Sequence, residues 1–198
     1  METKTVFVLG APASGKSTFI RFFSLAAKRK GRSAFAIYDG ELLRQLCPKI
    51  NIGRGRGYFY RGDSLILEDD SRQRILNLVF KEVASALLRN QNSYNYCLVE
   101  FTHPDWKMVL SNYFGEVFRL CPVLVFLTIG GRDSLRRNKL RKESSVVPDS
   151  YIRLFKGEDE KTDRWFRKKF DHFFKVDNQG KKRNLYTVAA DILGQLEG

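Results

Sequence analysis

The stretch that decides the fold reads Gly10-Ala11-Pro12-Ala13-Ser14-Gly15-Lys16-Ser17, and Thr18 follows it. It matches the pattern G-x-x-x-x-G-K-[ST] at every defined position. Residues 5–9 before it form an apolar run, and apolar residues recur with helical spacing after it. A strand, a glycine-rich loop and a helix in this order are the context that the pattern requires. The stretch therefore predicts a loop that binds phosphate groups.

Backbone chemistry explains why this pattern binds phosphate. Glycines at both ends let the chain turn tightly, so successive backbone N–H groups face one polyphosphate at the positive end of the following helix. We expect Lys16 to contact the β- and γ-phosphates of a nucleoside triphosphate and the Ser17 hydroxyl to ligate Mg²⁺. The residues expected to bind the nucleotide are Gly10, Ala13, Ser14, Gly15, Lys16, Ser17 and Thr18.

The composition indicates one domain with a strongly basic surface. The chain has 198 residues, 43% of them hydrophobic, which is enough to form a full core. Its 35 Lys and Arg residues against 22 Asp and Glu give a formal net charge of +13. This charge favours an anionic partner, which could be nucleic acid, a phosphorylated metabolite or a membrane surface. Charge alone does not choose among them, and solubility would also account for it.

The three cysteines, Cys47, Cys97 and Cys121, are odd in number and lack C-x-x-C spacing. They predict reduced, mainly buried thiols in a cytoplasmic protein rather than a disulfide framework or a zinc site. No apolar run has the length of a signal peptide or a membrane span, so we expect no membrane partner. The sequence leaves the oligomeric state open.

Apolar runs and helical patterns alternate along the chain. The expected strands are residues 5–9, 34–38, 96–99, 123–129 and 173–177. The expected helices follow the phosphate-binding loop and then cover residues 41–46, 68–90, 104–114, 132–142, 148–155, 158–171 and 184–196. This alternation predicts the α/β class, with a five-stranded parallel sheet, right-handed crossovers and helices on both faces. Residues 53–62 show no periodicity and predict a mobile basic and aromatic loop.

Four motifs stand in order along the chain: the phosphate-binding loop, Tyr38-Asp39-Gly40, the arginine-rich residues 136–141 followed by Val147-Pro148-Asp149, and Val176-Asp177-Asn178. Together they resemble the P-loop kinases of the nucleoside-monophosphate-kinase-like group, and within it the adenylylsulfate kinases, zeta-toxin-like kinases and polynucleotide kinases. The resemblance spans nearly the whole chain and implies a three-layer P-loop NTPase fold with ATP and Mg²⁺ as cofactors. It also implies a single domain in which residues 40–67 form a substrate-side insert and residues 132–157 an arginine-rich lid.

The resemblance implies that Asp39 is the general base that deprotonates the acceptor hydroxyl. Phosphoryl transfer needs positioning and charge neutralisation, and a carboxylate at the end of a strand beside the phosphate-binding loop suits both needs. The alternative is that Asp39 only forms a turn with Gly40. We also expect Arg44 and Glu100 to contact the acceptor, although Glu100 could instead hold the water shell of Mg²⁺. The third strand ends in Glu100-Phe101-Thr102-His103 and has no Asp after its apolar run, so no motif at this place supports metal coordination.

Arg137 and Arg141 resemble the lid arginines that close over the transferring phosphoryl group in these kinases. Their spacing of four residues would place both on one face of a helix. Arg136 competes for this role, and a solvated basic helix face is the alternative for all three. We interpret His103, which precedes Pro104, as a loop residue.

These features predict an ATP-dependent kinase that phosphorylates a hydroxyl of a small or nucleotide-like, anionic acceptor. The alternatives are a polynucleotide 5′-hydroxyl kinase and an ATP-binding regulatory module without turnover. A small acceptor is favoured because no separate nucleic-acid-binding motif is present, although residues 161–183 are strongly basic. The chain lacks the N-K-x-D, D-x-x-G and LSGGQ-type signatures, which argues against regulatory GTPases and transporter ATPases.

Overall fold

A parallel five-stranded sheet forms the centre of the computed structural model. The structure describes residues 3–46, 58–61, 64–67, 69–90, 92–114, 122–141, 147–155, 160–178 and 185–198. The sheet comprises β1 (Lys4–Gly10), β2 (Ala34–Tyr38), β5 (Tyr96–Phe101), β6 (Val123–Thr128) and β7 (His172–Asp177). The strand order is β2-β5-β1-β6-β7, and all neighbours are parallel. The prediction of a five-stranded parallel sheet is thus confirmed.

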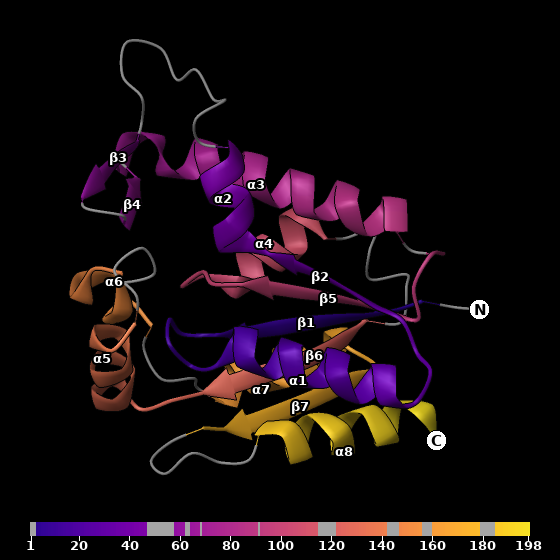
Figure 1. Ribbon diagram of the computed structural model, residues 1–198. Helices are drawn as coiled ribbons and strands as arrows, with labels where there is room; N and C mark the ends of the chain where they lie inside the picture. Colours follow the sequence, from indigo (N-terminus) through magenta and orange to yellow (C-terminus); the bar gives the residue numbers. More distant parts are fainter. Residues whose placement is uncertain are drawn as a thin grey trace.

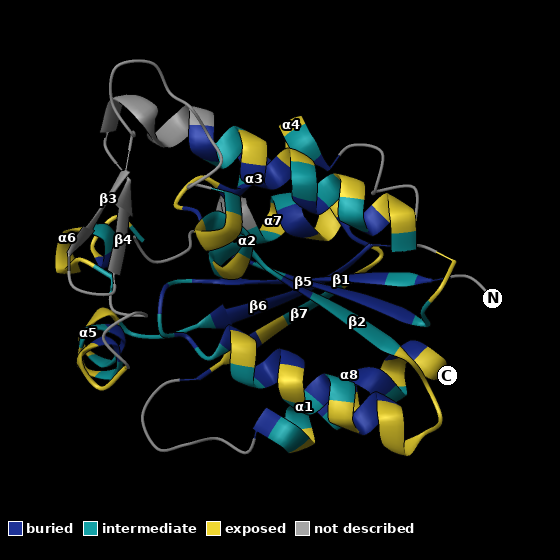
Figure 2. Ribbon diagram, turned by 45° about the horizontal axis from the view of Figure 1, so that its top comes forward, coloured by how far each residue is buried: buried dark blue, intermediate teal, exposed yellow. Residues whose placement is uncertain are grey.

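Helices cover both faces of the sheet and complete three layers (Figure 1). Helices α1 (Lys16–Arg29) and α8 (Leu185–Glu197) lie on one face, and α3 (Asp69–Asn90), α4 (Trp106–Tyr113) and α7 (Glu160–Lys169) lie on the other. Side chains alternate along β1, because Val6 and Val8 pack toward α1 and α8 whereas Phe7 and Leu9 pack toward α3 and α4. The central strands are the most deeply buried part of the chain (Figure 2).

The remaining elements gather at the carboxyl ends of the strands, on the left of Figure 1. Helix α2 (Asp39–Leu46) begins directly after β2, and α5 (Gly131–Lys139) and α6 (Asp149–Ile152) follow β6 along the chain. Strands β3 (Tyr58–Arg61) and β4 (Ser64–Leu67) pair antiparallel as a hairpin. In open parallel sheets this end of the strands is where ligands bind.

The hairpin corrects one prediction, because residues 58–61 form a strand and not a loop. Aromatic residues favour extended backbone, and two four-residue runs separated by a Gly-Asp pair are a hairpin signal in the sequence. The glycines and arginines nearby obscured this signal. Residues 53–57 and 62 lie outside the described part of the chain.

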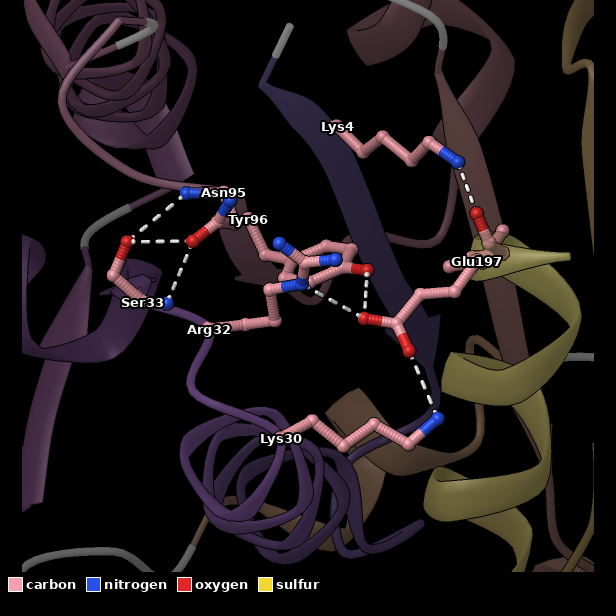
Figure 3. Close-up of polar contacts among 8 residues, drawn as sticks. Lys4, Lys30, Arg32, Ser33, Asn95, Tyr96 and Glu197 are labelled. Atoms are coloured by element: carbon pink, nitrogen blue, oxygen red, sulfur yellow. Dashed lines mark hydrogen bonds and ion pairs between the residues drawn. The ribbon is translucent and has the colours of Figure 1, made fainter. Parts of the chain in front are cut away.

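Polar contacts join the two helix ends at the opposite end of the sheet (Figure 3). Glu197 in α8 accepts hydrogen bonds from Lys30 at 2.8 Å and from Arg32 at 3.2 Å, just after α1. Lys4 donates to the Leu196 carbonyl oxygen. The contacts of Glu197 fasten the end of α1 to α8, and the contact of Lys4 fastens β1 to α8, far from the carboxyl ends of the strands.

Of the three cysteines, Cys97 is buried as a free thiol, as predicted, and Cys47 and Cys121 lie outside the described residues. Burial raises the pKa of the Cys97 thiol to about 11, which disfavours the reactive thiolate at neutral pH. Within the described ranges, no helix combines the length and apolar character needed to cross a bilayer.

Candidate active site

A cavity of about 1280 Å³ opens at the carboxyl ends of the strands. Its lining comes from the phosphate-binding loop, α1, the β2–α2 junction, α3, the end of β5, α5 and α6. Among its lining residues are Lys16, Asp39, Arg44, Glu100, Arg137 and Arg141. Six residues expected to take part in the chemistry, which lie far apart in the sequence, therefore face one space.

The phosphate-binding loop requires glycine at two positions. Gly15 has a φ of +100°, and Gly10 has a φ of +149° with the Leu127 carbonyl oxygen only 2.4 Å from where a Cβ would stand. Lys16 opens α1 and is 4% exposed. Its Nζ donates to the carbonyl oxygens of Gly10 at 3.0 Å and Ala11 at 2.9 Å. The ammonium group is thus held across the loop.

The other loop residues divide between the cavity and the core. Ala13, Ser17 and Thr18 line the cavity, and Ser17 is exposed, so its hydroxyl is accessible. Ser14 is fully buried, and its Oγ has no hydrogen-bond partner. The loop therefore presents its backbone and the Ser17 hydroxyl to a ligand, while the Ser14 side chain belongs to the interior.

Asp39 is the first residue of α2, so the helix begins two residues earlier than predicted. Its Oδ1 accepts from the backbone N–H of Gly40 and its Oδ2 from the backbone N–H of Thr102, both at 2.7 Å. Removal from water raises the pKa of Asp39 to about 7, and the negative charge of Glu100 adds to the rise. Lys16 and the two N–H groups act in the opposite direction. The carboxyl group thus titrates near neutral pH.

Glu100 lies in β5, opposite Val8 of β1 and Tyr38 of β2 in the ladder. Its Oε2 is buried and has no hydrogen-bond partner. A buried carboxylate oxygen without a donor is costly unless a cation, a water molecule or a hydroxyl group meets it. Together with the accessible Ser17 hydroxyl it offers oxygen ligands, which are the type that Mg²⁺ prefers.

Metal binding at this site would depend on more than protein ligands. Among the residues that the structure describes, no group of three or more His, Cys, Asp and Glu side chains could hold a metal ion. Mg²⁺ characteristically takes one or two protein oxygens and completes its shell with water and phosphate. The oxygen atoms of Ser17 and Glu100 fit this coordination preference.

Arg137 and Arg141 both line the cavity, but they do not lie on one helix. Helix α5 ends at Lys139, so Arg141 lies beyond it and the expectation of one shared helix face is wrong. The N–H groups of Leu140 and Arg141 donate to the carbonyl oxygens of Arg137 and Asn138, three residues earlier, so the helix ends in a turn. The buried Asn138 side chain pairs with both the N–H and the carbonyl oxygen of Val147, at 3.1 and 2.8 Å. Arg137 and Arg141 nevertheless line the same cavity.

The environments of the three arginines differ. Arg137 is half-buried, and its Nη2 donates to the Asn178 carbonyl oxygen at 2.8 Å. Arg141 remains solvent-exposed; partial desolvation lowers its pKa, the negative charge of Glu100 raises it, and the positive charge of Arg44 lowers it. Arg136 points elsewhere, because it pairs with Asp133 at 3.0 Å and does not line the cavity.

His103 also lies outside the cavity lining. It is 8% exposed, and its Nδ1 accepts from the backbone N–H of Asp105 at 3.0 Å. Burial lowers the pKa of the ring, so the neutral form is favoured. The histidine shapes the turn before α4, where Asp105 caps the helix by accepting from the Met108 N–H.

No protein-family model matches the sequence, and no curated protein matches it. The structure is similar to the APS kinase of Mycobacterium tuberculosis in complex with AMPPNP and APS, at 12% identity and a TM-score of 0.60, over 100% of this chain and 99% of that one. It is also similar to the shikimate kinase of Acinetobacter baumannii in complex with shikimate, at 15% identity and a TM-score of 0.53, over 98% and 93%. The chain has the fold of the P-loop kinases.

A third similar structure belongs to the Pnkp1/Rnl/Hen1 RNA repair complex, at 19% identity and a TM-score of 0.52. The match covers 86% of this chain and 47% of that one. The structural neighbours include an APS kinase, which belongs to one of the three groups named from the motifs, and a shikimate kinase, so the resemblance to P-loop kinases is confirmed at the level of the fold.

Within this P-loop kinase fold, several cavity residues escaped the sequence analysis. The apolar side chains of Leu76, Val79 and Phe80 from α3 form part of the lining, and Arg21 from α1 adds another cation. Tyr151 reaches from α6 to donate to the Thr102 carbonyl oxygen at 3.2 Å. In the sequence, the helical spacing of these residues indicated only whether they face the core or the surface. No local motif distinguishes a side chain that faces a cavity.

Proposed function

We propose that the protein is an ATP-dependent kinase that transfers the γ-phosphoryl group to a hydroxyl of a small or nucleotide-like, anionic acceptor. The single observation that carries this proposal is the shared cavity of Lys16, Asp39, Glu100, Arg137 and Arg141. Phosphoryl transfer requires cations around the transferring group and a carboxylate that orients the nucleophile. The lining of the cavity supplies both the cations and the carboxylates.

In this proposal the phosphate-binding loop and Lys16 hold the triphosphate. Lys16 exchanges its contacts with the Gly10 and Ala11 carbonyl oxygens for phosphate oxygens, since those carbonyls hold the ammonium beside the loop. Ser17 and Glu100 would hold Mg²⁺, directly or through its water shell. When bound there, such an ion would supply positive charge against the charge that develops on the phosphate groups.

Asp39 acts as the general base. A base is most effective when its pKa lies near the working pH, and a pKa of about 7 meets this condition. The hydrogen bonds from Gly40 and Thr102 fix both carboxylate oxygens but leave lone pairs free to accept the proton of the acceptor hydroxyl. Arg137 and Arg141 then stabilise the negative charge that spreads over the transferring phosphoryl group.

The walls of the cavity support an acceptor that is both anionic and partly apolar. Arg44 is exposed to the cavity and lies near enough to Arg141 to lower its pKa, so two like charges face the same space. An anionic group of the acceptor would relieve this repulsion. Leu76, Val79 and Phe80 offer an apolar surface to the rest of the molecule.

A polynucleotide acceptor is the second candidate, and the net charge of +13 favours it. One structural neighbour comes from an RNA repair complex.

The proposal also includes the organisation of the chain and its location. It comprises a single domain in which residues 40–67 form the substrate-side insert and residues 132–157 form the lid. The proposed location is the cytoplasm.

The test is transfer of radiolabel from [γ-³²P]ATP to separate pools of nucleotides, sugar nucleotides, small alcohols and oligonucleotides. We expect one of the small-molecule pools to be labelled by the parent and not by Lys16→Met. Labelling of the oligonucleotides alone would identify a polynucleotide kinase. ATP binding without transfer to any pool would instead support a regulatory module.

A further inference from the structure

Two buried side chains from outside the phosphate-binding loop donate hydrogen bonds to its backbone. The Ser134 hydroxyl, in α5, donates to the Pro12 carbonyl oxygen at 2.7 Å. The Asn178 side-chain amide, just after β7, donates to the Ser14 carbonyl oxygen at 2.8 Å. Ser134 is 1% exposed and Asn178 is 4% exposed, so water does not compete for either bond.

These bonds determine which way two peptide groups of the loop point. A trans peptide is planar, and its N–H is directed opposite to its carbonyl oxygen. A carbonyl of Pro12 held by α5 therefore directs the N–H of Ala13 to the other side of the loop. In the same way, a carbonyl of Ser14 held by Asn178 directs the N–H of Gly15 away from Asn178.

We propose that Ser134 and Asn178 are positioning residues that orient the N–H groups of Ala13 and Gly15 toward the polyphosphate. This inference rests on the proposed nucleotide-binding function of the loop. It assigns a role in ligand binding to two residues that need not touch the ligand. Ala13 has a φ of 60°, which is rare for a residue with a side chain, so the loop conformation needs such external support.

Asn178 also connects the loop to the proposed lid arginine. Its carbonyl oxygen accepts from Arg137, and its N–H donates to the Thr128 carbonyl oxygen at 2.9 Å. Arg137 lies in the same helix as Ser134, one turn further along. The two positioning residues therefore fix the loop and the Arg137 guanidinium relative to each other, at the ends of β6 and β7.

The experiment compares Asn178→Ala and Ser134→Ala with the parent and with the control Asn90→Ala. Asn90 is a matched control because its side-chain amide also donates to a backbone carbonyl oxygen, that of Ala86 at 2.8 Å, at the end of α3. Affinities for ADP and AMP are measured by calorimetry. The ¹⁵N order parameters of the Ala13 and Gly15 amides are measured on the ligand-free proteins.

We expect each loop variant to weaken ADP binding by about tenfold, which is typical for one net hydrogen bond, and to change AMP binding by less than about threefold. The order parameters should fall from about 0.85 toward 0.6 in both variants. Asn90→Ala should change neither quantity. Ser134→Ala removes only one oxygen atom, so it keeps the test decisive if Asn178→Ala does not fold.

Unchanged order parameters, or ADP and AMP affinities that fall together, would overturn the inference. A parent protein that binds neither ADP nor ATP would overturn the proposed function instead. In that case the order parameters alone still decide whether Ser134 and Asn178 orient the loop.

Discussion

The carboxylate of Asp39 accepts a hydrogen bond of 2.7 Å from the backbone N–H of Thr102, and this contact joins two segments 63 residues apart. It connects the start of α2 to the chain just after β5, beside Glu100. The proposed base is therefore held by the end of a central strand. Because both Asp39 oxygens accept from N–H groups, an asparagine at this position could satisfy only one of them.

Asp39→Asn should abolish the pH dependence of phosphoryl transfer near neutrality. In the parent, the single-turnover rate should rise through a pKa of about 7, because the base must be ionised to accept a proton. The rate at pH 5 should be roughly 100-fold below the plateau, since about 1% of such a group is ionised two units below its pKa. The variant should be slow at every pH. A variant that keeps the rise would place the base elsewhere, with Glu100 next to be tested.

The same substitution should change how stability depends on pH. The unfolded carboxyl group loses its proton near 3.8, and the folded one near 7. Between these values the folded state binds more protons, so the free energy of unfolding should fall as the pH rises through this window. Denaturation in urea at pH 5 and pH 8 should show a loss in the parent, on the order of 2–4 kcal/mol from this group, that Asp39→Asn lacks.

Asparagine also lowers the free energy of unfolding because it leaves one N–H group without an acceptor. This loss is the same at pH 5 and pH 8, so it cancels when the two pH values are compared. Asp171→Asn, on the surface, is the control. Equal pH dependence in the parent and in Asp39→Asn would show that Asp39 is ionised throughout the range.

Lys16→Met should leave the fold intact and slow the transfer step by roughly 100-fold or more, because a buried cation that meets developing phosphate charge is lost. Single-turnover kinetics with the acceptor identified by radiolabelling provide the measurement. Lys28→Met, on the exposed side of the same helix, is the control. A rate for Lys16→Met within threefold of the parent would contradict the assignment of the loop.

Gly15→Ala should be more destabilising than Gly31→Ala. Both glycines have a positive φ, which costs an L-residue about 1–2 kcal/mol. Nothing lies within 4 Å of a Cβ at Gly31, whereas a Cβ at Gly15 would stand 2.7 Å from Asn178 Nδ2. We expect an additional loss of about 1–2 kcal/mol at Gly15, measured by chemical denaturation.

The additional loss at Gly15 should depend on Asn178. Combining Gly15→Ala with Asn178→Ala should recover part of it, because the two residues are in contact and their effects are not additive. Additive losses in this double-mutant cycle would show that the Asn178 side chain moves aside without cost.

The salt dependence of oligonucleotide binding should distinguish the two acceptor classes. Helix α7 exposes Arg164, Arg167, Lys168 and Lys169, and a polynucleotide could use such a surface. Contact with about five phosphates of a single strand would reduce affinity by roughly 100-fold between 50 and 200 mM salt. We expect weak binding with a shallow slope, as for a small acceptor, and tight binding with the steep slope would reverse that preference.

The sequence by itself determined the class of the fold and the nature of its principal loop. Apolar runs near Val8 and Val125, separated by helical patterns, are local signals that a parallel sheet requires. The phosphate-binding loop is equally local, because its glycines, Lys16 and Ser17 act within a few residues of one another. For this reason the sheet and the loop were predictable from the chain. The end of the apolar run at residues 34–38 also indicated that Asp39 lies at the same edge of the sheet as the loop.

Only the tertiary structure decided how distant residues meet. The insertion of β5 between β1 and β2 brings Glu100 beside Asp39, and no local pattern encodes this strand order. The turn after α5 directs Arg141 into the cavity although helical spacing does not. Ser134 and Asn178 contact the loop across 122 and 164 residues of chain. Such contacts depend on the order of the strands and on how the connecting helices pack. Neither leaves a local pattern in the sequence.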